Sequence, residues 1–145
     1  MKRHYTTKQM GNACEMLVAA ELTLAGIPAM KVPDNWPGYD VIAQPVGAAP
    51  QKISVKSRTF KTGGSTYVEY EDGDDFDWLA VVLLPGGGVT TRRLFVIPRA
   101  VADMSARRNS PKSKFPTSRY WRPDEVPQLF AAFENNFGLE QAGRT

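Results

Sequence analysis

The sequence contains almost none of the residues that build disulfides or zinc sites. Its 145 residues include one cysteine, Cys14, and one histidine, His4. A single cysteine excludes an internal disulfide, and with one cysteine and one histidine there is no Cys/His cluster to suggest zinc. His4 also lies in a terminal segment, which argues against a catalytic-triad or metal-ligand role.

A long uninterrupted apolar run is also absent. Met1-Lys2-Arg3 could begin a signal peptide, but the apolar stretch after it carries Glu15 and Glu21. These carboxylates argue against both a signal-peptide core and a membrane span. With 42% hydrophobic and 23% charged residues, the chain has the composition of a soluble globular protein. We expect a single domain over residues 1–145, located in the cytoplasm.

The net charge of +3 is unevenly distributed along the chain. Residues 69–77 contain six acids: Glu69, Glu71, Asp72, Asp74, Asp75 and Asp77. Residues 99–122 contain one acid, Asp103, and seven bases: Arg99, Arg107, Arg108, Lys112, Lys114, Arg119 and Arg122. A local basic segment favours a polyanionic partner. The alternative is a solvated loop, which is the usual role of a charge run.

Apolar periodicity predicts three helices. In the first, Thr6 or Thr7 caps a helix that runs to about Ala25, and Gly26 ends it. This helix is apolar around most of its circumference, so we expect it to be largely buried against a sheet.

The other two helices lie in the C-terminal half. One begins at Pro98, where the missing N–H of proline costs nothing. Residues 109–123 are polar, basic and interrupted by proline, which predicts a loop. The last helix, Asp124–Phe137, is amphipathic, with an inner face made of Val126, Leu129, Phe130 and Phe133.

Five segments have the pattern of strands: Ala29–Val32, Tyr39–Ala43, Lys52–Arg58, Trp78–Leu84 and Arg93–Ile97. The second and third are joined by a connection that suits an antiparallel hairpin. The fourth is the most apolar and should be the central strand, covered on both faces. The whole pattern indicates a mixed α/β fold, one sheet with helices on its faces.

Polar side chains gather on one face of the third strand: Lys52, Ser54, Lys56 and Arg58. Asp40 lies on the strand before it, so the hairpin can bring Asp40 beside Ser54 and Lys56. In the first helix, Gly11 lies one turn before Glu15 and leaves open space beside its carboxylate. The sequence therefore predicts that Glu15, Asp40 and Lys56 converge at one edge of the sheet.

This ordered set resembles a known family. Gly11 and Glu15 in the first helix, Gly38-Tyr39-Asp40 on a strand and Ile53–Ser57 on the next are similar to the motifs of the PD-(D/E)XK nuclease superfamily. Its small single-domain members, including Holliday-junction resolvases and restriction-endonuclease-like proteins, have the most similar layout. The resemblance covers roughly residues 7–98 and implies a restriction-endonuclease-like core of αβββαβ type. Each motif is short, and only the ordered set is moderately specific.

The resemblance implies a magnesium- or manganese-dependent endonuclease that acts on nucleic acid, with DNA as the expected substrate. Asp40 would be the principal metal ligand, Glu15 would bind the metal directly or through water, and the Val55 carbonyl would complete the ligands. Lys56 would orient the attacking water or stabilise developing charge. Basic residues would contact phosphates: Arg58, Arg107, Arg108, Lys112, Lys114, Arg119 and Arg122. Many related enzymes act as dimers, so a homodimer is a further expectation.

The departure from the family pattern is Ser54. The family usually has Glu, Asp or Gln at this position, two residues before the lysine. Serine supplies no charge and only a weak oxygen ligand, so two carboxylates remain where three are usual. Ser54 therefore decides whether the chain is an active nuclease.

The individual residues also have ordinary explanations. Glu15 could lie at the edge of a buried helix face, Asp40 could be a turn residue at a strand start, and Lys56 could be an exposed strand lysine. Three hypotheses remain open: an active nuclease, a catalytically degenerate module of the same fold that binds nucleic acid or a partner protein, and a pure protein-interaction domain.

Overall fold

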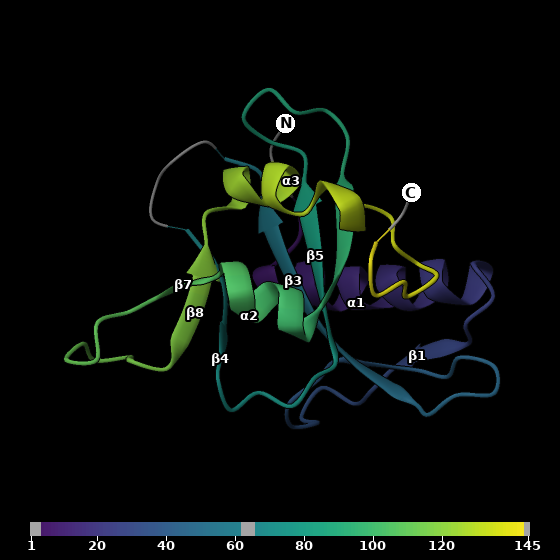
Figure 1. Cartoon of the computed structure of the whole chain (residues 1–145). Helices are drawn as coiled ribbons and strands as arrows, with labels where there is room; N and C mark the ends of the chain where they lie inside the picture. Colours follow the sequence, from purple (N-terminus) through teal and green to yellow (C-terminus); the bar gives the residue numbers. More distant parts are fainter. Residues whose placement is uncertain (1–3, 62–65, 144–145) are drawn as a thin grey trace.

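The main sheet has five strands, in the order β1-β2-β3-β5-β6 (Figure 1). The computed structural model describes residues 4–61 and 66–143. The strands are β1 Ala29–Lys31, β2 Val41–Ala43, β3 Gln51–Thr59, β5 Trp78–Leu84 and β6 Arg93–Pro98. Neighbouring strands are antiparallel except β3 and β5, which are parallel. The mixed α/β class and the β2–β3 hairpin are thereby confirmed.

Strand β5 is the buried centre of this sheet, as its sequence predicted. It pairs with β3 on one side and with β6 on the other, and all its residues from Trp78 to Leu83 are buried. Alternate side chains enter two different cores: Trp78, Ala80 and Val82 on one face, and Leu79, Val81 and Leu83 on the other. Because both faces are covered, an almost continuous apolar run is stable here.

The first helix, α1, covers one face of the sheet and spans Thr7–Leu24. Thr6 is its N-cap: the Thr6 hydroxyl accepts a hydrogen bond from the Gln9 backbone N–H at 3.1 Å, and the Gln9 side chain accepts one from the Thr6 N–H at 2.9 Å. This capping box satisfies donors at the helix start. Gly26 follows the helix with a φ of 105°, a left-handed conformation that glycine adopts without strain.

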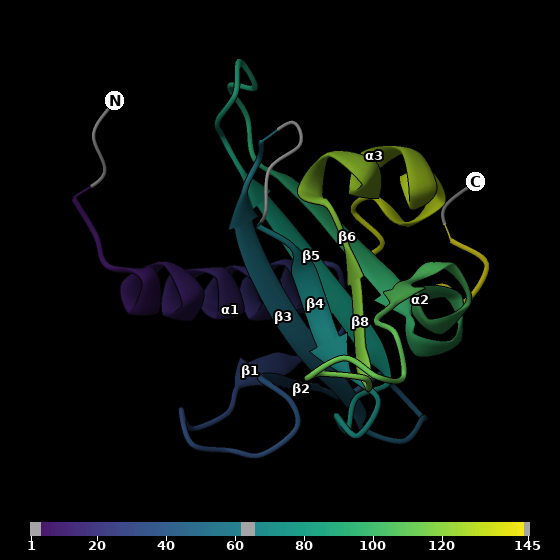
Figure 2. The ribbon, with the colours of Figure 1, turned by 90° about the vertical axis from the view of Figure 1, so that its left-hand side faces the viewer.

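The expectation that α1 is largely buried was wrong. Only Cys14, Val18, Ala19 and Leu22 are buried, on the stripe that faces the sheet. The other apolar residues include Leu24, which is 84% exposed. The reason is that α1 meets the sheet on one side only (Figure 2). No helix in the described ranges is long and apolar enough to cross a membrane.

A second, three-stranded sheet covers the opposite face, together with helix α2, Arg99–Ser105 (Figure 2). Its strand order is β4-β8-β7, with β4 Val68–Glu71, β8 Ser118–Trp121 and β7 Arg107–Arg108. The predicted loop over residues 109–123 therefore contains a strand, and part of the acidic run is also a strand. Two sets of contacts explain these strands. Trp121 is fully buried in the core beneath the sheet, and Asp72 of the acidic run pairs with Arg108 and Arg119 of the basic segment.

The predicted αβββαβ order also differs at the connection between the parallel strands. Between β3 and β5, the described residues form strand β4 rather than a crossover helix. Pro98 is likewise the N-cap of α2 and not its first residue.

The C-terminal helix expected over Asp124–Phe137 is broken into three short pieces. They are a 3-10 turn at Pro123–Glu125, α3 at Val126–Leu129 and a second 3-10 turn at Ala131–Phe133. Pro127 explains the break before α3, since it lacks an N–H and its ring clashes with the preceding turn unless it lies in the first turn of a helix. Val126, Phe130 and Phe133 are buried as predicted, whereas Leu129 is 49% exposed.

Candidate active site at the β2–β3 fork

Asp40 lies at the point where β2 separates from β3. Its backbone N–H donates to the Ile53 carbonyl at 2.9 Å, and its carbonyl accepts from the Val32 N–H at 3.0 Å. Beyond this point the Asp40 side chain takes the place of a strand partner for Val55, because Oδ2 accepts a hydrogen bond from the Val55 N–H at 2.7 Å. Within residues 4–61 and 66–143, no group donates a hydrogen bond to Oδ1. Asp40 is therefore fixed in place with one oxygen available.

The carbonyl of Val55 faces the same edge as Asp40. In a strand, the N–H and C=O of one residue point the same way, and those of the next residue point the opposite way. Since the Val55 N–H points to Asp40, the Val55 carbonyl does too. The fork thus presents a carboxylate and a backbone carbonyl side by side.

Glu15 comes to the same edge from α1. Its side chain is 19% exposed, on the helix side that also carries Val18 and Leu22, both fully buried against the sheet. Burial raises the pKa of Glu15, the negative charge of Asp40 raises it further, and the charge of Lys31 opposes both. The structure therefore places the Glu15 and Asp40 carboxylates within each other's electric field.

Lys31 is a residue of this site that the sequence did not single out. Its Nζ lies 3.5 Å from Glu15 Oε1 and 2.6 Å from Asp34 Oδ1. A short strand had been predicted around Lys31, but its contact with Glu15 depends on how β1 packs beside α1. The one signal in the sequence is that Lys31 lies between two acids, Glu15 and Asp34.

The Lys56 side chain projects from the face of β3 opposite to that of the Val55 side chain. Val55 pairs with Ala80 and Lys56 with Val81 of β5, and these two partners belong to opposite cores. Among the described residues, no hydrogen bond or ion pair joins Lys56 to Glu15 or Asp40. The structure thus brings Glu15 and Asp40 together, and it places Lys56 at the same fork without a direct contact.

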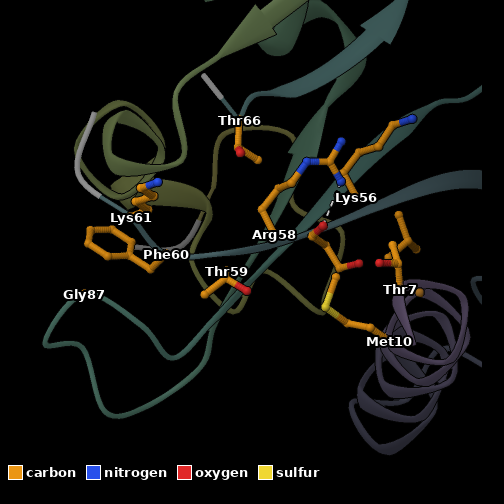
Figure 3. A pocket seen from close by; sticks show the side chains of 12 residues that line it. Thr7, Met10, Lys56, Arg58, Thr59, Phe60, Lys61, Thr66 and Gly87 are labelled. Carbon is orange, nitrogen blue, oxygen red and sulfur yellow. Dashed lines mark hydrogen bonds between the residues drawn. The ribbon is translucent and has the colours of Figure 1, made fainter. Parts of the chain in front are cut away.

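A basic groove runs from this fork along β3 (Figure 3). It has a volume of about 950 Å³ and lies between the start of α1 and the second half of β3. Its charged lining residues, within the described part of the chain, are all basic: Lys56, Arg58 and Lys61. Figure 3 shows Lys56 and Arg58 extending from β3 away from Met10 of α1. A groove of this charge suits a polyanion.

Two residues shape the groove. Arg58 is fixed, since its Nε and Nη1 donate to the carbonyls of Tyr67 and Ser57, each at 2.7 Å. Gly11 lines the groove, and a Cβ added there would meet nothing within 4 Å. Gly11 therefore leaves open space at the groove, and the space predicted beside the Glu15 carboxylate stays a prediction.

Ser54 is 4% exposed and lies beside Leu79 of β5. In residues 4–61 and 66–143, no group of three or more His, Cys, Asp or Glu side chains could hold a metal ion. The oxygen donors that remain are the carboxylates of Asp40 and Glu15 and the carbonyl of Val55. These hard donors fit Mg²⁺, which is commonly held by one or two carboxylates and keeps several waters.

The arginines of the basic segment form ion pairs within the chain. Arg108 and Arg119 each lie 2.5 Å from Asp72, Arg107 pairs with Glu125, and Arg122 lies 3.3 Å from Asp124. Lys112 and Lys114 are exposed and have no ion-pair partner among the described residues. Much of the segment's positive charge is thus balanced locally, and its contact with nucleic acid stays a prediction.

Helix α1 on one face, the antiparallel β1–β3 unit, the parallel strand β5 and an aspartate at the β2–β3 fork together define a restriction-endonuclease-like fold. Two solved structures resemble the chain. The chain is similar to the bacterial homing endonuclease I-Ssp6803I, with 15% sequence identity, 93% of each chain covered and a TM-score of 0.59. It also matches Hjc, a Holliday junction resolvase of the archaeal hyperthermophile Archaeoglobus fulgidus, with 16% identity, 84% of this chain and 88% of that chain covered, and a TM-score of 0.49.

The likeness to the homing endonuclease establishes the fold, and the predicted restriction-endonuclease-like class is confirmed. No family model and no curated protein sequence matches the chain.

Proposed function

We propose that this chain is a metal-dependent endonuclease that cleaves DNA. The observation that carries the proposal is the position of Asp40. Its carboxylate is fixed at the β2–β3 fork by the Val55 N–H, close enough to Glu15 to raise the pKa of that residue. The nuclease fold supports the same conclusion at a coarser level.

The residues would divide the work as follows. Asp40, Glu15 and the Val55 carbonyl would hold Mg²⁺ or Mn²⁺, which supplies neutralisation of phosphate charge and a more acidic water. Lys56, which lines the groove next to Val55, would stabilise the negative charge that develops on the phosphate. Arg58 and Lys61 would bind neighbouring phosphates through charge attraction.

Cleavage of supercoiled plasmid DNA in Mg²⁺ or Mn²⁺ tests this proposal. We expect wild type to nick the plasmid and Asp40→Asn to lose at least about a hundredfold in rate, since a metal ligand is lost. Asn keeps an oxygen that can accept the Val55 hydrogen bond, so the fold should survive. Lys56→Met should also lose activity, and by more than Lys112→Met, which removes the same charge from the basic segment. Equal rates in wild type and Asp40→Asn would refute the assignment.

The degenerate module is a second candidate, favoured by Ser54. This residue stands where the related motif has a carboxylate, and it is almost fully buried. On this hypothesis, wild type binds DNA with an affinity that falls steeply with salt but does not cut it. Ser54→Glu would then restore cleavage by supplying the third carboxylate.

The remaining expectations have their own tests. A pure protein-interaction domain would show no salt-dependent DNA binding at all. A homodimer would give twice the chain mass of 16.0 kDa in light scattering. A cytoplasmic location is proposed as well, and cell fractionation tests it.

A further inference from the structure

Lys31 is held between two carboxylates in a way that an ordinary surface lysine is not. Its ammonium contacts three oxygens: Asp34 Oδ1 at 2.6 Å and the Val32 carbonyl at 3.2 Å, with Glu15 Oε1 further away at 3.5 Å. The Lys31 side chain is only 21% exposed. An ammonium has three N–H donors, so the contacts to Asp34 and Val32 leave one for Glu15.

The fold gives Lys31 this position. β1 pairs with β2 so that Lys31 lies opposite Val41, the residue after Asp40. The next residue of the chain, Val32, donates its N–H to the Asp40 carbonyl. Lys31 is therefore tied by backbone hydrogen bonds to the same fork that presents Asp40, and its charge offsets the repulsion between Glu15 and Asp40.

We propose that Lys31 is a positioning residue: it serves as the built-in counter-ion of the Glu15 and Asp40 carboxylates, and it stays with Asp34 and releases Glu15 when a divalent cation binds. The inference rests on the proposed metal site. In the metal-free protein, the Lys31 ammonium contacts Glu15 and offsets part of the negative charge of Glu15 and Asp40. When the cation arrives, like charges repel, and Lys31 keeps its two shorter contacts while it gives up the longest one.

Two consequences follow for metal affinity. Lys31 competes with the metal for Glu15, so its removal should tighten metal binding. Asp34 holds Lys31 away from Glu15, so loss of the Asp34 charge should weaken metal binding, and it should do so only while Lys31 is present.

Titration of the intact protein with Mn²⁺, followed by the EPR signal of free Mn²⁺, tests this directly. We expect Lys31→Met to bind about tenfold more tightly than wild type, because a positive charge beside the site is removed. Lys31→Arg should keep roughly the wild-type affinity. Asp34→Asn should bind several-fold more weakly, roughly the change expected for one nearby charge.

A double-mutant cycle separates the Lys31 mechanism from a general charge effect. In the Lys31→Met background, Asp34→Asn should have little further effect. Lys112→Met matches the net-charge change of Lys31→Met and should leave Mn²⁺ affinity unchanged. Thermal denaturation of each variant establishes that it is folded.

The outcomes distinguish the two proposals. If wild type binds Mn²⁺ and Lys31→Met binds it equally or more weakly, the role of Lys31 is refuted and the metal site stands. An effect of Asp34→Asn that is the same with and without Lys31 also refutes it. If neither wild type nor Lys31→Met binds Mn²⁺, the metal site itself fails, and the counter-ion proposal fails with it.

Discussion

At the scale of single residues, the fork combines one rigid carboxylate with one whose ionised form is disfavoured by burial. Asp40 is fixed by a hydrogen bond from the Val55 N–H. Glu15 is instead held in a partly buried place beside a like charge, which raises its pKa. A protein that needed Glu15 only for folding would gain from an uncharged residue here. We infer that its position serves binding rather than stability.

Substitution of Glu15 by glutamine should therefore stabilise the fold at neutral pH. A raised pKa means that the folded state disfavours the ionised carboxylate, so ionisation costs stability above the ordinary value of 4.5. Below that pH, Glu15 is protonated in both states and the cost disappears. We expect Glu15→Gln to unfold at higher urea concentration than wild type at pH 7, with the advantage shrinking towards pH 4. Destabilisation at pH 7 would contradict this account.

At the scale of elements, Gly11 shows how α1 serves the groove. Glycine in the middle of a helix lowers stability relative to alanine, and here no neighbour requires its small size, since a Cβ would meet nothing within 4 Å. Its conformation is not left-handed either. The remaining explanation is the space that it leaves beside the groove.

Gly11→Ala should accordingly raise the free energy of unfolding by about 0.5–1 kcal/mol. Urea denaturation measures this change directly. Gly11→Leu, which fills the groove, should weaken DNA binding without unfolding α1. If Gly11→Ala destabilises the protein, Gly11 has a packing role that the structure does not show.

The elements that could be predicted from sequence are those with strong local patterns. β5 is a long apolar run, and α1 has both a cap at Thr6 and a terminating Gly26. β8 could not be predicted in this way, because Ser118–Trp121 is short and its register with β4 depends on residues about fifty positions earlier in the chain. The continuous C-terminal helix was wrong because Pro127 outweighs an amphipathic pattern.

The same distinction between local patterns and long-range packing applies to the candidate site. Asp40 and Glu15 could be found from motif spacing, and the structure brings them together. Lys31 could not, since its contact with Glu15 arises only when β1 and α1 pack side by side. The pairing of the basic segment with Asp72 and Glu125 was also invisible to a count of local charge.

At the scale of the whole molecule, the ion pairs redistribute the positive charge. The arginines on the second sheet are balanced by acids, whereas Lys56, Arg58 and Lys61 line a groove with no acid among its described residues. The groove, rather than the basic segment, should therefore dominate attraction of nucleic acid.

The salt dependence of DNA binding tests this distribution. Each phosphate contact contributes a slope of about −0.9 to log K against log salt. We expect Lys61→Met to reduce the slope by about one contact and Arg107→Met to change it little. The reverse result would place the DNA on the second sheet.

The central claim is that Asp40, Glu15 and Val55 form one metal site. A crystal structure with Mn²⁺, located by its anomalous scattering, tests it most directly. The account predicts a peak at the β2–β3 fork, about 2.0–2.3 Å from an Asp40 oxygen and the Val55 carbonyl, with Glu15 bound directly or through water. A fork without a peak at saturating Mn²⁺, or carboxylates too far apart to share one ion, would contradict it.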